Sequence, residues 1–273
     1  MGNVEVAWED VISVINMVRT HLIIIAIAFI AMIAVVTLNV AAAETLYNTL
    51  NVVLSDKGTL DQGHIDNSKK VIEDVTNEGV VMTKNDNSFL PIAPQKINVF
   101  GWSSTNPVYG GTGSGTVDAT TAVGILKGLE NAGFETNSEL SDMYTEYRQD
   151  RPVISINDGQ DWTLPEVPAA DYSDKIINDA KDFSDVAMIV LSRTGGEGTD
   201  LPIDMGPIMD GSTMDIGTKY TKGTYTNNSK DYDDFEDGQS YLELSKTEQD
   251  LVDLVCSNFD DVIVVYNGAN AME

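Results

Sequence analysis

The chain has 273 residues and an apolar fraction of 42%, which suits one large globular domain or two small ones and excludes a disordered polyanion. Its 43 acidic residues outnumber its 16 basic residues, and the formal net charge of -27 argues against nucleic acid as a partner and favours a neutral ligand such as a sugar. The single cysteine excludes an intrachain disulfide, and the two distant histidines give no support to a zinc site or a Ser/His/Asp triad.

A long apolar segment lies near the N-terminus. No charged residue occurs from Leu22 to Ala43, and a helix of roughly 20 apolar residues is long enough to cross the hydrocarbon layer of a membrane. Arg19 precedes this run and weakly marks the cytoplasmic side. Residues 1–21 are therefore predicted to be cytoplasmic and residues 22–43 to be a transmembrane anchor at the cell membrane, with the main domain extracellular.

Cleavage of this segment is the alternative. Ala41-Ala42-Ala43 is similar to the small-residue site at which signal peptides are cut, in which case the domain is secreted. An uncleaved anchor is favoured because Glu5, Glu9 and Asp10 make the preceding stretch acidic and because the apolar run is longer than the usual signal core.

Residues 44–63 are expected to connect the anchor to one domain over residues 64–273. The apolar spacing predicts helices over 64–78, 118–132, 171–182 and 245–258, and strands over 97–101, 134–136, 186–191 and 262–266. This alternation is typical of parallel strands joined by helical crossovers, so the predicted fold class is α/β, a layered sandwich with a mostly parallel sheet. Cys256, in the last helix, is expected to be a buried apolar side chain. Two polar stretches, 137–170 and 193–243, do not fit the alternation and are expected to be functional loops.

One acidic residue lies among glycines where a buried strand is predicted to end. The segment 192–200, Ser-Arg-Thr-Gly-Gly-Glu-Gly-Thr-Asp, directly follows the apolar run 186–191. Open α/β sheets bind their ligands at the carboxyl ends of strands, and glycines allow a backbone to approach a ligand closely. Glu197 is therefore the first candidate catalytic residue, with Arg193 and Asp200 as candidate substrate-binding residues. A solvated loop is the alternative.

A second glycine-rich loop, residues 110–115, suggests a nucleotide site. A phosphate-binding P-loop is excluded because Thr116-Val117-Asp118 follows instead of Gly-Lys-Ser/Thr. A dinucleotide site would need the glycines directly after the strand, whereas eight residues separate Gly101 from Gly110. A loop beside a substrate pocket is favoured, and a nucleotide-dependent enzyme remains an alternative that requires nucleotide binding.

Two further features bear on ligands. Trp102 and Trp162 lie outside the predicted helices and strands, where an indole can stack on a sugar ring or simply pack against the protein. The acidic tract 231–238 is no EF-hand, because Phe235 falls on the third ligand position and Leu244 on the twelfth. A solvated loop is expected there, with a looser cation site as the alternative. We expect neither a metal ion nor a cofactor.

Four blocks of sequence occur in the order found in a known family. They are residues 78–86, residues 99–101 with 110–115, residues 195–202, and residues 266–273. Residues 64–273 thereby resemble the α/β sandwich domain of glycoside hydrolase family 3, of the β-glucosidase type. In that family a (β/α)8 barrel supplies an aspartate nucleophile and the sandwich supplies the general acid/base. The resemblance implies that Glu197 is this acid/base in the hydrolysis of terminal β-glucosidic bonds with retention.

The chain departs from the family in two ways. It contains no barrel, and it stops at Met272-Glu273, where the family's sandwich continues. An anchor that leads directly into the sandwich is similar to the family's inverted domain order, which implies a barrel beyond residue 273. The expected substrate is a β-glucoside or oligosaccharide, and these residues alone are expected to be inactive. A membrane-tethered, non-catalytic carbohydrate-binding or scaffold protein is the alternative.

Overall fold

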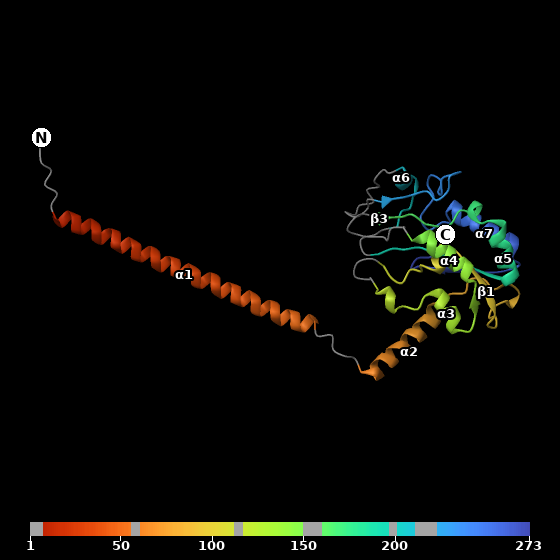
Figure 1. Cartoon of the computed structure of the whole chain (residues 1–273), viewed down its shortest axis with the longest axis horizontal. Helices are drawn as coiled ribbons and strands as arrows, with labels where there is room; N and C mark the ends of the chain where they lie inside the picture. Colours follow the sequence, from red (N-terminus) through yellow and green to blue (C-terminus); the bar gives the residue numbers. More distant parts are fainter. Residues whose placement is uncertain (1–7, 56–60, 112–116, 150–159, 197–200, 211–222) are drawn as a thin grey trace. The chain divides into compact units, whose positions relative to one another are not determined.

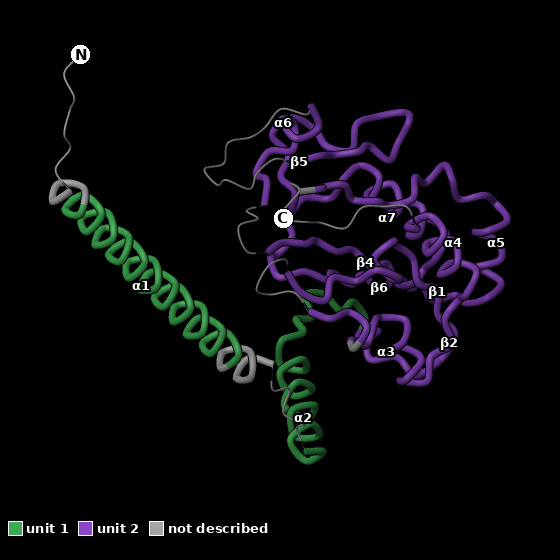
Figure 2. Tube along the Cα trace, turned by 60° about the vertical axis from the view of Figure 1, so that its left-hand side comes forward, with its two compact units in different colours: residues 1–87 green, residues 88–273 purple. Residues whose placement is uncertain are grey.

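The computed structural model describes residues 8–55, 61–111, 117–149, 160–196, 201–210 and 223–273. The chain divides into two units, residues 1–87 and residues 88–273, which Figure 2 colours separately.

The first unit contains the long apolar helix that the sequence predicts. Helix α1 (Trp8–Ser55) includes a stretch, Ile12–Asn48, that is long and apolar enough to cross a membrane, and none of it is buried against other protein. A position near the N-terminus is compatible with an anchor or with a signal sequence. The helix continues through Ser55, so the predicted connector is largely helical where the structure describes it.

The second helix of this unit confirms the predicted amphipathic segment. Helix α2 (Gln62–Gly79) begins two residues earlier than predicted because the Asp61 side chain accepts a hydrogen bond from the backbone N–H of His64 at 3.1 Å. No residue of the helix is buried. A short 3-10 turn, η1 (Asp86–Ser88), links the two units.

The second unit is built on a four-stranded parallel sheet of order β2-β1-β4-β6. Its strands are β1 (Lys96–Phe100), β2 (Glu135–Thr136), β4 (Val186–Ser192) and β6 (Asp261–Asn267). Val99 pairs with Met188, and Met188 pairs with Ile263, so the three longer strands are in register through the middle of the sheet. The α/β prediction is confirmed.

Alternate residues of β4 enter two separate cores. Ala187, Ile189 and Leu191 pack in a cluster with helices α4 (Ser138–Arg148), α5 (Asp174–Phe183) and α7 (Lys246–Asn258), which lie next to one another in Figure 1. Val186, Met188 and Val190 pack in a cluster on the other face with helix α3 (Ile125–Asn131). A strand with apolar residues on both faces is the pattern expected for a sheet covered by helices on both sides.

Two predictions for the residues before β4 were wrong. The predicted helix 118–132 is split, because Asp118 accepts a hydrogen bond from Thr120 N in the short turn η4 (Ala119–Thr121), and Gly124 then caps α3 in an extended conformation. The polar stretch 137–170 contains α4, whose Asn137 cap and buried Leu140 and Tyr144 lie on one helical face. The turn η5 (Ala169–Asp171) begins at the end of this stretch, and the turn η2 (Trp102–Ser104), which follows β1, packs against α4.

The second predicted loop, 193–243, holds part of a small core of its own. Short elements α6 (Gly206–Met209), β3 (Gln160–Asp161) and β5 (Gly223–Thr224) surround buried side chains that include Trp162, Met205 and Tyr241. The acidic tract is also not a wholly solvated loop, since Asp234 and Phe235 are buried. Cys256 was expected to be buried and is exposed, because α7 turns that side of the helix away from the sheet.

Candidate active site at the carboxyl ends of the strands

The loops that follow β1, β4 and β6 meet at one edge of the sheet. These strands are parallel neighbours, so their carboxyl ends lie together. Asn267, the last residue of β6, accepts hydrogen bonds from Val108 N at 2.6 Å and from the Ser192 hydroxyl at 3.0 Å. Its amide also donates to the Val108 carbonyl at 3.2 Å. One side chain therefore joins the loop after β1 to the end of β4.

The two glycine-rich loops approach each other closely. A Cβ atom on Gly111 would lie 2.9 Å from the Gly195 carbonyl oxygen and 3.1 Å from the Gly196 Cα. Only glycine fits at such a distance from another backbone. Glu197 and Asp200 lie outside the described residues, as do residues 112–116. The structure thus brings together the described start of each loop.

Trp102 lies at this edge, but the residue is buried, with 6% of its surface exposed. The backbone N–H of Trp102 donates to the Glu166 carboxylate at 3.0 Å, and the Arg148 guanidinium lies 4.6 Å from the ring centroid. The indole Nε1 is buried and has no hydrogen-bond partner among the residues that the structure describes. Trp162, the other candidate platform, is 1% exposed and packs edge-on against Tyr241, so it offers no face to a sugar.

Glu166 is a buried carboxylate that the sequence reasoning missed. Its two oxygens accept hydrogen bonds from Trp102 N at 3.0 Å and Val167 N at 2.9 Å. Burial raises the pKa of Glu166 to about 8, although both backbone N–H groups act to lower it. The available signal was a carboxylate set in the apolar, proline-flanked run Leu164-Pro165-Glu166-Val167-Pro168.

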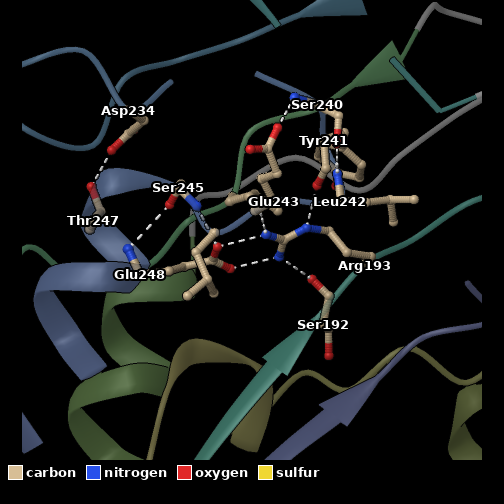
Figure 3. A network of polar contacts seen from close by, with 12 residues as sticks. Ser192, Arg193, Asp234, Ser240, Tyr241, Leu242, Glu243, Ser245, Thr247 and Glu248 are labelled. Atoms are coloured by element: carbon tan, nitrogen blue, oxygen red, sulfur yellow. Dashed lines mark hydrogen bonds and ion pairs between the residues drawn. The ribbon is translucent and has the colours of Figure 1, made fainter. Parts of the chain in front are cut away.

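Arg193 is held in a buried network at the start of the Gly-Glu-Gly loop (Figure 3). Its guanidinium forms a two-pronged ion pair with Glu248, with both N···O distances 2.7 Å. Its remaining N–H groups donate to three backbone carbonyls, those of Ser192 at 2.9 Å, Tyr241 at 2.6 Å and Glu243 at 2.7 Å. All five donors of this side chain are therefore used within the protein.

A second buried carboxylate lies beside this network. Asp234 accepts hydrogen bonds from the Tyr225 hydroxyl at 2.6 Å, from Asn228 N at 3.1 Å and from the Thr247 hydroxyl. Thr247 and Glu248 are neighbours in the first turn of α7, so the acidic tract is fastened to the same helix end (Figure 3). Among the residues that the structure describes, no group of three or more His, Cys, Asp or Glu side chains is placed to hold a metal ion.

Comparison with known proteins places the chain in a family. The glycosyl hydrolase family 3 C-terminal domain matches residues 80–273. β-Glucosidase A of Butyrivibrio fibrisolvens is 30% identical over 229 residues, which cover 80% of this chain and 24% of that protein. A β-glucosidase of Ruminococcus albus is 31% identical over 131 residues, which cover 46% of this chain and 13% of that protein.

A solved structure gives the same result. β-Glucosidase 3B of Thermotoga neapolitana in complex with glucose matches with a TM-score of 0.51 and 26% identity, over 74% of this chain and 24% of that one. The chain thus spans about a quarter of the length of that enzyme and of the Butyrivibrio relative. Because the domain match extends over most of the chain, from Val80 to Glu273, the protein belongs to the glycosyl hydrolase family 3 C-terminal domain family.

Proposed function

We propose that this chain supplies the general acid/base for hydrolysis of terminal β-glucosidic bonds with retention. Glu197 is the proposed acid/base. The observation that carries the proposal is the position of residues 193–196, which precede Glu197. They follow β4 at the sheet edge, where Gly111 of the loop after β1 lies against the backbone of Gly195 and Gly196. The similar β-glucosidases support the substrate class.

The proposed chemistry needs a second carboxylate. Retaining glycosidases place two carboxyl groups about 5 to 5.5 Å apart, one as nucleophile and one that protonates the leaving oxygen and then activates water. The nucleophile is proposed to come from a (β/α)8 barrel outside residues 1–273. Glu197 must be protonated at the start of the cycle, and the nearby nucleophile carboxylate would raise its pKa. Asp200 remains a proposed substrate contact, as does Trp102 if its indole N–H reaches the substrate.

Substitution of Glu197 tests this proposal in the protein that joins this chain to a barrel. Glu197→Ala should lower kcat/KM for an alkyl β-glucoside by about 10²–10⁴-fold, since general acid catalysis contributes that much. A dinitrophenyl β-glucoside should be affected less because its leaving group needs no proton, and azide should restore part of the rate. Glu236→Ala, at an exposed glutamate of the same domain, is the matched control.

The outcomes separate the alternatives. Unchanged activity in Glu197→Ala would move the assignment to Asp200. Residues 1–273 alone should show no turnover of an aryl β-glucoside, and measurable turnover would contradict the need for a second domain. If neither residues 1–273 nor the protein joined to a barrel hydrolyses the substrate, but the chain binds sugar, a non-catalytic carbohydrate-binding protein would be favoured.

A further inference from the structure

Tyr241 bonds both ends of the segment that carries Glu197. On the entry side, Arg193 Nε donates to the Tyr241 carbonyl at 2.6 Å. On the exit side, Tyr241 N donates to the Pro202 carbonyl at 2.9 Å. We call the residues at the two ends of this segment, Arg193–Gly196 and Leu201–Pro202, the stem of the loop. Both ends of the stem are bound to the backbone of a single residue, which sets the distance between them.

Tyr241 is itself firmly placed. Its side chain is 1% exposed, and its ring packs edge-on against Trp162 with centroids 4.9 Å apart. The Arg193 guanidinium lies 5.4 Å from the centroid of the same ring. Because Tyr241 is anchored in a close-packed core, it cannot shift without moving its neighbours.

Glu248 offsets the free-energy cost of burying the charged guanidinium of Arg193. The two side chains are 1% and 0% exposed, and a second hydrogen bond from Ser245 N, at 2.9 Å, fixes the carboxylate at the start of α7 (Figure 3). Burial acts to lower the pKa of Arg193, but the Glu248 charge more than offsets it and the pKa is raised. A buried arginine without such a partner would be strongly unfavourable.

We propose that Arg193, Tyr241 and Glu248 form a clamp that fixes the stem of the Glu197 loop, and that Arg193 and Glu248 are positioning residues. The inference rests on the proposed role of Glu197. It assigns Arg193 a role other than substrate binding, since its five N–H groups are all donated within the protein and none is left for a sugar hydroxyl. Small displacements of an acid/base from its productive geometry cost large factors in rate, so a rigid stem has a direct catalytic use.

Hydrogen–deuterium exchange of the whole chain in detergent micelles tests the clamp without relying on activity. Arg193→Lys keeps the charge but loses the two-pronged geometry, and Glu248→Gln removes the counter-charge. Each should speed exchange of the amides that bond the stem, those of Arg193 (to the Asn267 carbonyl) and Tyr241 (to the Pro202 carbonyl), by about tenfold or more, the effect of losing a hydrogen bond to a charged group. Exchange in β1 should stay unchanged.

The control is Ile97→Ala in the core on the opposite face of the sheet, where Ile97 is 1% exposed. It should speed exchange across the sheet without singling out the stem. Unchanged stem exchange in both clamp variants, or an increase spread evenly over the sheet, would overturn the clamp.

Kinetics of the protein joined to a barrel then separate positioning from binding. If Arg193 positions Glu197, Arg193→Lys should lower kcat about tenfold and leave KM within about twofold, because only an interaction that acts in the transition state is lost. A raised KM with unchanged kcat would assign Arg193 to substrate binding and overturn the positioning role. Glu197→Ala leaves Arg193, Tyr241 and Glu248 unchanged, so its result judges the proposed function separately.

Discussion

Gly101 shows how one residue shapes the edge of the sheet. It follows β1 with φ +95°, a conformation that L side chains rarely adopt, and a Cβ atom there would lie 2.3 Å from the Val190 carbonyl oxygen. The chain can therefore leave β1 tightly against β4 only if this residue is glycine. This turn places the Trp102 backbone N–H within hydrogen-bond distance of the Glu166 carboxylate.

Gly101→Ala should lower the free energy of unfolding by about 3 kcal/mol, from backbone strain and the clash together. Gly128→Ala is the matched control, because Gly128 lies in α3 with no atom within 4 Å of an added Cβ. It should stabilise the domain by about 0.5–1 kcal/mol through helix propensity. Urea denaturation of both variants checks the pair, and equal effects would contradict the steric argument.

Glu166 should make stability depend on pH. Its pKa of about 8 in the folded protein lies above the ordinary value of 4.5, so the folded state binds more protons than the unfolded state between these values. The free energy of unfolding should therefore fall as pH rises from about 4.5 to 8, by at most roughly 5 kcal/mol. The sign is opposite to that of a carboxylate with a lowered pKa.

Glu166→Gln tests this dependence. The amide cannot ionise, so the fall in stability with pH should flatten, although one of the two backbone N–H groups then faces an NH₂ group and the variant should lose about 1–3 kcal/mol at pH 5. Denaturation at pH 5, 6.5 and 8 measures both effects. Glu130→Gln, at an exposed position in α3, serves as the control that should keep the slope. A slope that survives in Glu166→Gln would assign it to another group.

At the scale of elements, α7 organises the site through its first turn. Ser245 caps the helix by accepting from Glu248 N at 3.2 Å, while the Glu248 carboxylate accepts from Ser245 N at 2.9 Å. This capping box is buried, and its glutamate is also the partner of Arg193. The start of a helix and the stem of a loop are thus held by one carboxylate.

Ser245→Ala should cost about 2 kcal/mol, at the upper end of the usual range for a lost N-cap, because the cap is buried and orients Glu248. Ser173→Ala removes the corresponding cap of α5, which is exposed and has Ile176 instead of a glutamate at the third helical position, and should cost about 1 kcal/mol or less. Thermal or urea unfolding compares the two. Similar losses would mean that the link to Glu248 adds nothing.

At the scale of the whole molecule, the single cysteine reports the side of the membrane on which the domain lies. Cys256 is exposed on α7, and the sequence contains no other cysteine. If α1 anchors an extracellular domain, a membrane-impermeant maleimide should label intact cells at this position, and an alkaline wash should leave the protein in the membrane. Labelling only after permeabilisation would reverse the orientation, and release by the wash would favour a cleaved segment. Cys256→Ser is the control that should not be labelled.

Several features could be predicted from the sequence because they depend on near neighbours in the chain. The apolar run in α1, the strands β1, β4 and β6, and the helices α5 and α7 all follow from local periodicity. Helix α4 was missed because its polar residues dominate the pattern, and only two of its side chains, Leu140 and Tyr144, are buried.

The sequence by itself determined the α/β class, the candidate Gly-Glu-Gly loop and the family resemblance, because periodicity, glycine content and motif order are properties of the chain as written. Only the tertiary structure decided that Arg193 is paired with Glu248, 55 residues away, and that Tyr241 bonds both ends of the stem. It also decided that Trp162 is buried and Cys256 exposed. These outcomes depend on which side chains the helical crossovers bring together and on how far each side chain stays exposed to solvent. A local sequence pattern encodes neither the long-range contacts nor the exposure.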